Sequence, residues 1–462
     1  MVEQETVKKR IGFHTSGTER ISYGLYFFGQ NVFYYILTQF LGPFMTDIGI
    51  AAATAAVITM IVKIWDAVND PIFGGIVDRV RFKRGKFIPW LRISLILIPL
   101  STVFLFAAPA GITDVAKVIW VTIGYVLWDT AYTICDVPIY GLVTTMTGNL
   151  EERTSVMAIG RIFAGLGAAA AVMLLPQIRE AVGGWLPSVV IASVLALIVM
   201  APVLFTAKER IEPPKSETEP GLREMFRFFK SNKYMLVFNL ALIITSFTNV
   251  AGALNVYFAR YLLGDEKMLT LFAALVLIPM LVASAFMPAL VKKYDKFKMY
   301  FFASVMSVVM GLVQFFIGYG NLTVLIITTI LRYIPAGVTS ALIFMFTPDV
   351  AEYGHYKTGV RASGIAFSIQ TFTAKLTGAI STAMGLFALA FIGFIEGEGA
   401  VQLSGFNDKF WFIYALVPCV GAAVSLIVLW MYKLRDKDVQ IMTDCNSGAI
   451  SREEAERLLG QK

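Results

Sequence analysis

Histidine and cysteine are scarce in this 462-residue sequence. The only two histidines, His14 and His355, argue against a histidine-based metal site or a histidine-dependent catalytic triad. The three cysteines are far apart and form no Cys-x-x-Cys pair; they are Cys135, Cys419 and Cys445. This spacing indicates neither a disulfide framework nor a zinc site.

Charged residues are also few, at 15%, whereas a soluble domain has about a quarter. Hydrophobic residues make up 57% and the mean hydropathy is +0.69, so we predict a polytopic membrane protein. The net charge is +7, but the surplus lies in short loops between apolar runs, which is typical of topology signals rather than of nucleic-acid binding. No phosphate-binding loop, HExxH motif or nucleophile elbow stands in a credible context, so we expect neither an ATP-driven pump nor an enzyme.

Long apolar runs dominate what is present, and a membrane span needs about 20 such residues. The sequence predicts an all-α membrane protein with twelve transmembrane helices, at about 21–47, 52–78, 88–109, 115–147, 154–182, 186–207, 233–263, 268–292, 297–318, 322–350, 362–394 and 408–434. A polar stretch, 208–230, divides them into an N-terminal six-helix bundle (1–207) and a C-terminal one (231–434), followed by a cytoplasmic tail (435–462). Bases in alternate loops predict that both termini and the 208–230 loop are cytoplasmic.

Two carboxylates stand out inside the second apolar run. Asp66 and Asp70 are four residues apart and share a helical face, with Asn69 close to it. An acidic residue at membrane depth is a functional-site hypothesis by default. Two stacked carboxylates repel each other, so they need a cation, a basic partner or a proton on one of them.

The fourth apolar run carries a face suited to a sugar. Tyr132, Asp136 and Tyr140 repeat at intervals of four, with Thr133 beside them. Aromatic rings pack against the apolar faces of sugars, and a carboxylate accepts hydrogen bonds from hydroxyls. The alternative is a packed helix with one paired aspartate. Asp129, also inside this run, has no predicted role.

Charged residues elsewhere allow two interpretations each. Arg161 either pairs with Asp136 or a substrate, or extends to the interface. Lys375 lies within an apolar run and must pair or deprotonate, and the carboxylates of the other half are its candidate partners. Four charged residues lie near the ends of two predicted spans; they are Asp78, Arg79, Asp349 and Glu352. They either form a cytoplasmic gate or only determine the membrane topology.

Three motifs resemble those of a known family. They are Trp65-Asp66-Ala67-Val68-Asn69-Asp70-Pro71, Tyr132-Thr133-Ile134-Cys135-Asp136-Val137-Pro138 and Tyr353-Gly354-His355-Tyr356-Lys357. Their order and spacing resemble the glycoside–pentoside–hexuronide:cation symporters, the family of the melibiose permease, which have the major facilitator fold.

The resemblance implies two sets of site residues. Cation binding, of sodium, lithium or a proton, would fall to Asp66, Asn69, Asp70 and Thr133, with Asp66 and Asp70 as the metal ligands if sodium or lithium is used. Substrate binding or coupling would fall to Asn31, Tyr132, Asp136, Tyr140, Arg161 and Lys375. Asn31 replaces an acidic sugar ligand of the family, and Tyr140 and Ser340 replace tryptophans. These departures put galactoside specificity in doubt and make an anionic sugar easier to accept.

We therefore predict a secondary transporter of the plasma (inner) membrane that moves a sugar, glycoside, pentoside or hexuronide together with sodium or a proton by alternating access. The alternative from another class is a facilitator-type exporter of lipophilic compounds. We expect no cofactor other than the coupling cation. The expected partners are the sugar, the cation and membrane lipid, with no nucleic acid, and the functional form is expected to be a monomer.

Overall fold

The computed structural model describes residues 15–80, 82, 85–147, 149–210, 230–359 and 363–460. Within these ranges the regular structure is helical, apart from one isolated bridge between Phe82 and Gly85. Eleven helical segments of the described chain are long and apolar enough to cross a membrane. The predicted first span corresponds to α2 (Gly17–Asp47), which is not among the eleven because polar residues such as Gln30 and Asn31 interrupt its apolar run.

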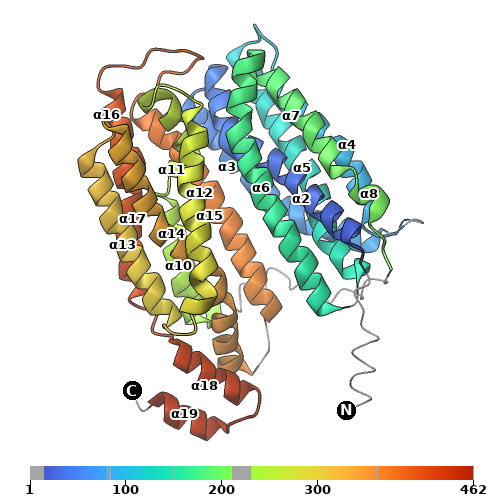
Figure 1. Cartoon of the computed structure of the whole chain (residues 1–462), viewed down its shortest axis with the longest axis vertical. Helices are drawn as coiled ribbons and strands as arrows, with labels where there is room; N and C mark the ends of the chain where they lie inside the picture. Colours follow the sequence, from blue (N-terminus) through green and yellow to red (C-terminus); the bar gives the residue numbers. More distant parts are fainter. Residues whose placement is uncertain are drawn as a thin grey trace. The chain divides into compact units, whose positions relative to one another are not determined.

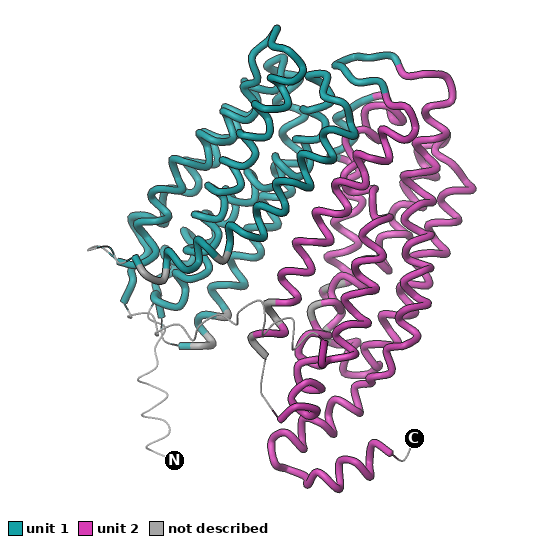
Figure 2. The backbone as a smooth tube through the Cα atoms, turned by 180° about the vertical axis from the view of Figure 1, so that it is seen from behind, with its two compact units in different colours: residues 1–216, 265–270, 395–401 teal, residues 217–264, 271–394, 402–462 magenta. Residues whose placement is uncertain are grey.

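The chain divides into two compact units, drawn in teal and magenta in Figure 2. The first comprises residues 1–216, 265–270 and 395–401. Its helices are α2, α3 (Ala52–Arg79), α4 (Ile88–Phe106), α5 (Asp114–Met146), α6 (Leu150–Val182), α7 (Trp185–Met200) and the short α8 (Val203–Thr206). Helix α2 packs against α6 and α7, and α5 packs against α3 and α4. These contacts bring α2, α3, α5 and α6 together around the predicted site residues.

The second unit comprises residues 217–264, 271–394 and 402–462. Its helices are α10 (Lys233–Ser246), α11 (Ala251–Tyr257), most of α12 (Met268–Leu290), α13 (Lys296–Ile317), α14 (Leu322–Thr358), α15 (Ser363–Phe391), α16 (Phe406–Trp411) and α17 (Val417–Leu429). Two π-helical turns, η1 (Phe258–Leu262) and η2 (Phe412–Leu416), interrupt it. The tail forms α18 (Asp436–Asn446) and α19 (Arg452–Gly460), and α18 packs on α14 (Figure 1).

Glycine explains the close packing of α2 on α6. A Cβ atom added at Gly167 would lie 2.1 Å from the carbonyl oxygen of Phe28. On the α2 helix, a Cβ atom added at Gly24 would lie 2.7 Å from the Phe163 ring of α6. The two backbones therefore approach more closely than any larger residue allows, as small-residue helix contacts do in membranes. The Gly/Ala-rich stretch of the sequence predicts close packing of this kind.

Side-chain caps fix the ends of helices in the first unit. Ser16 and Glu19 form a reciprocal capping box at the start of α2. The Glu209 carboxylate accepts hydrogen bonds from three successive backbone N–H groups, of Lys86, Phe87 and Ile88, at 2.8–2.9 Å. A negative charge at this position satisfies the free N–H groups that begin α4 and interacts favourably with its dipole.

Candidate functional site

A hydrogen-bonded chain links α3 to α5 in the first unit. The Asn69 amide donates to Thr133 Oγ1 at 2.8 Å, and the Thr133 hydroxyl donates to Asp70 Oδ1 at 3.0 Å. Asn69 and Thr133 are both buried, at 6% and 2% exposure. Three of the four residues predicted to bind the cation therefore contact one another directly, although they come from positions more than 60 residues apart.

Asp66, the fourth residue, has a basic partner that sequence reasoning missed. Lys63 Nζ lies 3.3 Å from Asp66 Oδ2 and 3.6 Å from Asp129 Oδ1. Lys63 and Asp66 are three residues apart on α3, so they share a face, and this spacing is a signal that the sequence contains. The contact with Asp129 depends on the packing of α3 on α5. The lysine thus bridges a predicted cation ligand and the aspartate for which no role was predicted.

The donor set of this region suits a small hard cation or a proton. Carboxylate, amide and hydroxyl oxygens are the ligands that such cations prefer, whereas transition metals favour imidazole and thiolate. In the part of the chain that the structure describes, no group of three or more histidine, cysteine, aspartate or glutamate residues is placed to hold a metal ion. A cation here would accordingly be held by two carboxylates and neutral oxygens, in competition with the ammonium of Lys63.

Several of the predicted substrate residues lie on the α5 face. Asp136 Oδ1 accepts a hydrogen bond from Gln30 of α2 at 2.7 Å. The ring of Tyr132 stacks on that of Trp128, with centroids 5.0 Å apart at 15°, and lies 5.5 Å from the Tyr34 ring. These contacts join α2 and α5 through aromatic rings and, one turn further along α5, through the Asp136 carboxylate. Sequence reasoning missed Gln30 as the partner of Asp136, because the two residues are on different helices and meet only in the folded unit.

Tyr140 and Arg161 extend this surface toward α6. The Tyr140 ring is 46% exposed and packs edge-on against Phe27, with centroids 5.1 Å apart. Arg161 is exposed and lies close enough to interact electrostatically with the Tyr140 hydroxyl, as does Asp136. Asn31 differs, because its amide nitrogen donates to the Phe27 carbonyl of its own helix at 2.9 Å.

The remaining predicted residues lie elsewhere. Lys375 is on α15 in the second unit, with an exposed side chain. Asp78 and Arg79 end α3, but their side chains lie outside the described residues. Lys296 Nζ donates to Asp349 Oδ1 at 2.7 Å, and Glu352 accepts from Asn446 of the tail at 2.8 Å. Asp349 and Glu352 are thus bound within their own unit, and their gating role remains a prediction.

Comparison with known proteins gives a consistent answer. The model of the family described as MFS/sugar transport protein matches residues 22–436. The isoprimeverose transporter of Lactiplantibacillus pentosus is 26% identical over 92% of this chain and 91% of its own length. The glucuronide carrier protein homolog of Escherichia coli is 27% identical over 90% and 92%. Among solved structures, the nucleoside transporter NupG superposes with a TM-score of 0.64 at 15% identity, over 91% of this chain and all of that one, a likeness of fold alone.

Proposed function

Because this chain belongs to the MFS/sugar transport protein family, among the glycoside–pentoside–hexuronide:cation symporters, we propose that it couples the movement of a sugar or glycoside to that of a monovalent cation. Family membership identifies a multi-pass integral protein of the plasma membrane and a secondary transporter of sugar-type substrates. The relatives' names are those of transporters, not enzymes. The coupling cation, the substrate subclass and the residues that bind each are the proposal.

The hydrogen-bonded chain of Asn69, Thr133 and Asp70 carries this proposal. Polar side chains inside a membrane span are costly and mark a functional site by default, and here an amide and a carboxylate of α3 meet a hydroxyl of α5. Asp70 is the carboxylate of this hydrogen-bonded network, and Asp66 is one helical turn away on α3. Sodium, lithium or a proton arriving here would relieve the repulsion between the two carboxylates.

Lys63 gives the coupling a physical basis. Its ammonium pairs with Asp66 when the cation is absent and so offsets part of the negative charge of the empty site. Asp129 offers the same ammonium a second carboxylate 3.6 Å away. A cation that takes over Asp66 would transfer Lys63 to Asp129, so the ammonium would keep a carboxylate partner in both states.

The sugar would bind against the α5 surface. Tyr132 and Tyr140 offer ring faces for the apolar side of a sugar, while Asp136 accepts hydroxyl hydrogen bonds. Arg161 adds a donor for hydroxyl or carboxylate oxygens. Asp136 and the cation residues Asp70 and Thr133 lie on the same two helices, so occupation of one group changes the field at the other.

The transport cycle would be alternating access. We propose twelve transmembrane helices in two six-helix bundles with cytoplasmic termini, and a substrate site near the bilayer midplane. Lys375 would complete the site, while Asp78, Arg79, Asp349 and Glu352 would gate the cytoplasmic side. We further propose that the monomer is the functional form.

Uptake into membrane vesicles tests the coupling. A panel of glycosides, pentosides and uronides is offered with and without a sodium gradient and with and without a pH step. We expect one class to accumulate only with a cation gradient, Asp70→Asn to abolish accumulation, and Asp136→Asn to weaken sugar binding by about tenfold or more, as loss of a charged hydrogen bond does. Asp114→Asn, at the 86%-exposed start of α5, is the matched control. Accumulation by Asp70→Asn at the wild-type level would contradict the coupling role, and unchanged sugar binding by Asp136→Asn would contradict the sugar site.

A further inference from the structure

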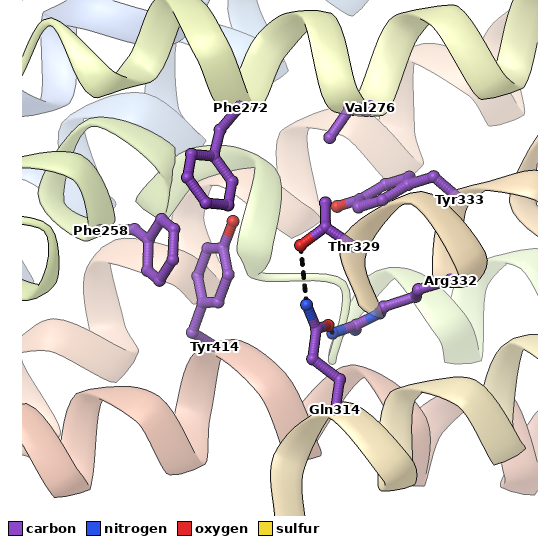
Figure 3. A pocket seen from close by; sticks show the side chains of 8 residues that line it. All are labelled: Phe258, Phe272, Val276, Gln314, Thr329, Arg332, Tyr333 and Tyr414. Carbon is purple, nitrogen blue, oxygen red and sulfur yellow. Dashed lines mark hydrogen bonds between the residues drawn. The ribbon is translucent and has the colours of Figure 1, made fainter. Parts of the chain in front are cut away.

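A small cavity lies inside the second unit, apart from the α3–α5 site (Figure 3). Polar side chains line one part of it and aromatic rings the other; the residues that matter here are Gln314, Thr329, Arg332, Tyr333, Phe258 and Tyr414. Its free volume is about 10 Å³, which is close to the smallest space that holds one water molecule. A cavity of this size admits one small particle and excludes a sugar.

Arg332 brings a positive charge to this cavity. It is the eleventh residue of α14, so it lies about 15 Å along the helix at 1.5 Å per residue. A charged side chain at such a depth in a membrane span needs a partner. Across the described ranges, Arg332 makes one hydrogen bond, from Nη1 to Gln314 Oε1 at 2.8 Å, and no ion pair with a carboxylate. A neutral amide oxygen orients the guanidinium but leaves its charge uncompensated.

Hydrogen bonds within the unit hold the neighbouring polar groups. The Gln314 amide nitrogen donates to Thr329 Oγ1 at 2.9 Å, as the dashed line in Figure 3 marks. Thr329 in turn donates its hydroxyl hydrogen to the Leu325 carbonyl at 2.7 Å. The amide nitrogen and the amide oxygen of Gln314 each make a hydrogen bond, and this side chain orients the guanidinium. Gln314 and Thr329 are buried, at 4% and 3% exposure, so these hydrogen bonds lie inside the unit and not on its surface.

Spare hydrogen-bond donors remain at the cavity. Arg332 has five N–H groups and no acceptor. Tyr333 also lines the cavity, and its hydroxyl makes no hydrogen bond within the described part of the chain. Tyr414, by contrast, donates its hydroxyl hydrogen to Asn255 at 3.0 Å. A ligand of this cavity must consequently accept hydrogen bonds, and the uncompensated guanidinium favours one with a negative charge.

The backbone around the cavity is irregular on two sides. Phe258 comes from η1 and Tyr414 from η2, the two π-helical turns of this unit. Their rings stack in parallel, with centroids 4.4 Å apart at an angle of 3°. π-Helical turns are rare and occur often at functional sites. Gly311 lies beside this region and leaves room for Cys419, because a Cβ atom there would clash with Cys419 Sγ, whereas Arg332 Cζ would be at an ordinary contact distance of 3.7 Å.

We propose that this cavity binds one small inorganic anion of halide size, chloride being the natural example, through Arg332 and Tyr333. The anion supplies the negative charge that Arg332 lacks. The volume restricts it to a monatomic ion and excludes a substrate carboxylate attached to a sugar ring. The site goes beyond the proposed transport function, and its test does not depend on transport.

Thermal stability of the purified full-length protein in detergent tests the site. Chloride is titrated against methanesulfonate, an anion without sugar hydroxyls, at constant sodium concentration and ionic strength, so that binding of the coupling cation does not change. We expect a saturable rise in apparent Tm with chloride, because a ligand that binds the folded state stabilises it. Arg332→Gln should weaken the apparent chloride affinity by about tenfold or more, and Tyr333→Phe by a smaller factor.

Two controls isolate the effect. Arg92→Gln removes an exposed arginine of the first unit, and Tyr319→Phe removes a hydroxyl bonded to Asp408 outside the cavity; both should keep the wild-type response. A crystal grown in bromide should show an anomalous peak beside Arg332. Equal Tm in chloride and methanesulfonate, a chloride response preserved in Arg332→Gln, or a bromide peak elsewhere would overturn the proposal. If Arg332→Gln fails to fold, Tyr333→Phe and the bromide position decide.

Discussion

At the scale of single residues, Glu19 illustrates how a charge pair at the end of a helix contributes to stability. Arg210 reaches both carboxylate oxygens of Glu19 at 2.9 Å, and Ser16 completes the cap. Burial alone would raise the pKa of Glu19, but the hydrogen bonds from Arg210 and Ser16 outweigh it and lower the pKa below the ordinary value of 4.5. The stabilisation is therefore complete above the ordinary pKa and is lost as the pH falls through the lower, folded value.

We expect Glu19→Gln to destabilise the protein at pH 7 by about 1–2 kcal/mol. The difference from wild type should shrink as the pH falls from about 5 to about 3, since the wild-type carboxylate is then protonated. Apparent Tm measured across this pH range checks the prediction. Glu453→Gln, on the exposed face of α19, should show no such trend. A Tm difference that stays constant down to pH 3 would mean that the Glu19 charge is not involved.

Residue spacing and the resemblance singled out the candidate residues, but not their hydrogen-bond and ion-pair partners. Asp66 and Asp70 follow from their i, i+4 spacing, and Thr133 from the resemblance. Lys63 was overlooked although its i, i+3 relation to Asp66 is local. The contact of Gln30 with Asp136 had no local signal, because the two residues are 106 positions apart in the sequence. Periodicity does not show which helices lie next to each other.

At the scale of helices, hydropathy locates the spans better than it describes them. The predicted 322–350 span is the α14 helix, which runs on to Thr358 because its last turns are polar but still helical. The predicted 233–263 span is divided into α10, α11 and η1, and 408–434 into α16, η2 and α17. A helix break or a π-helical turn changes only a few backbone hydrogen bonds and does not alter which residues are apolar. The hydropathy of the sequence therefore does not predict it.

Gly167 makes the packing of α6 on α2 testable. Gly167→Ala should destabilise the protein by about 1–3 kcal/mol, because its Cβ atom would meet the Phe28 backbone oxygen and not a movable side chain. Gly165→Ala on the same helix meets no atom within 4 Å, so it should be neutral or slightly stabilising through helix propensity. Apparent Tm of the two variants provides the comparison. Equal Tm values would show that α2 and α6 can separate without cost.

At the scale of the whole molecule, cation and sugar sites that communicate must obey reciprocity. If the cation raises sugar affinity by some factor, the sugar must raise cation affinity by the same factor, typically 5- to 150-fold. The proposed exchange of Lys63 between Asp66 and Asp129 supplies a route, because it changes the charge beside α5 when the cation binds. This coupling involves both binding sites at once, so it is measured on the full-length protein.

Calorimetry on the purified full-length protein measures both effects, that of the cation on sugar affinity and that of the sugar on cation affinity. Isoprimeverose and a methyl glucuronide are the first probes. Sugar affinity is determined with and without sodium, and sodium affinity with and without sugar. We expect equal factors in the two directions and a factor close to one in Asp70→Asn, since that variant cannot hold the cation between two carboxylates. If sodium has no effect but acidification strengthens sugar binding, the proton is the coupling cation and the same equality must hold against pH. Sugar binding that responds to neither cation would contradict symport itself, because nothing would then tie movement of the sugar to an ion gradient.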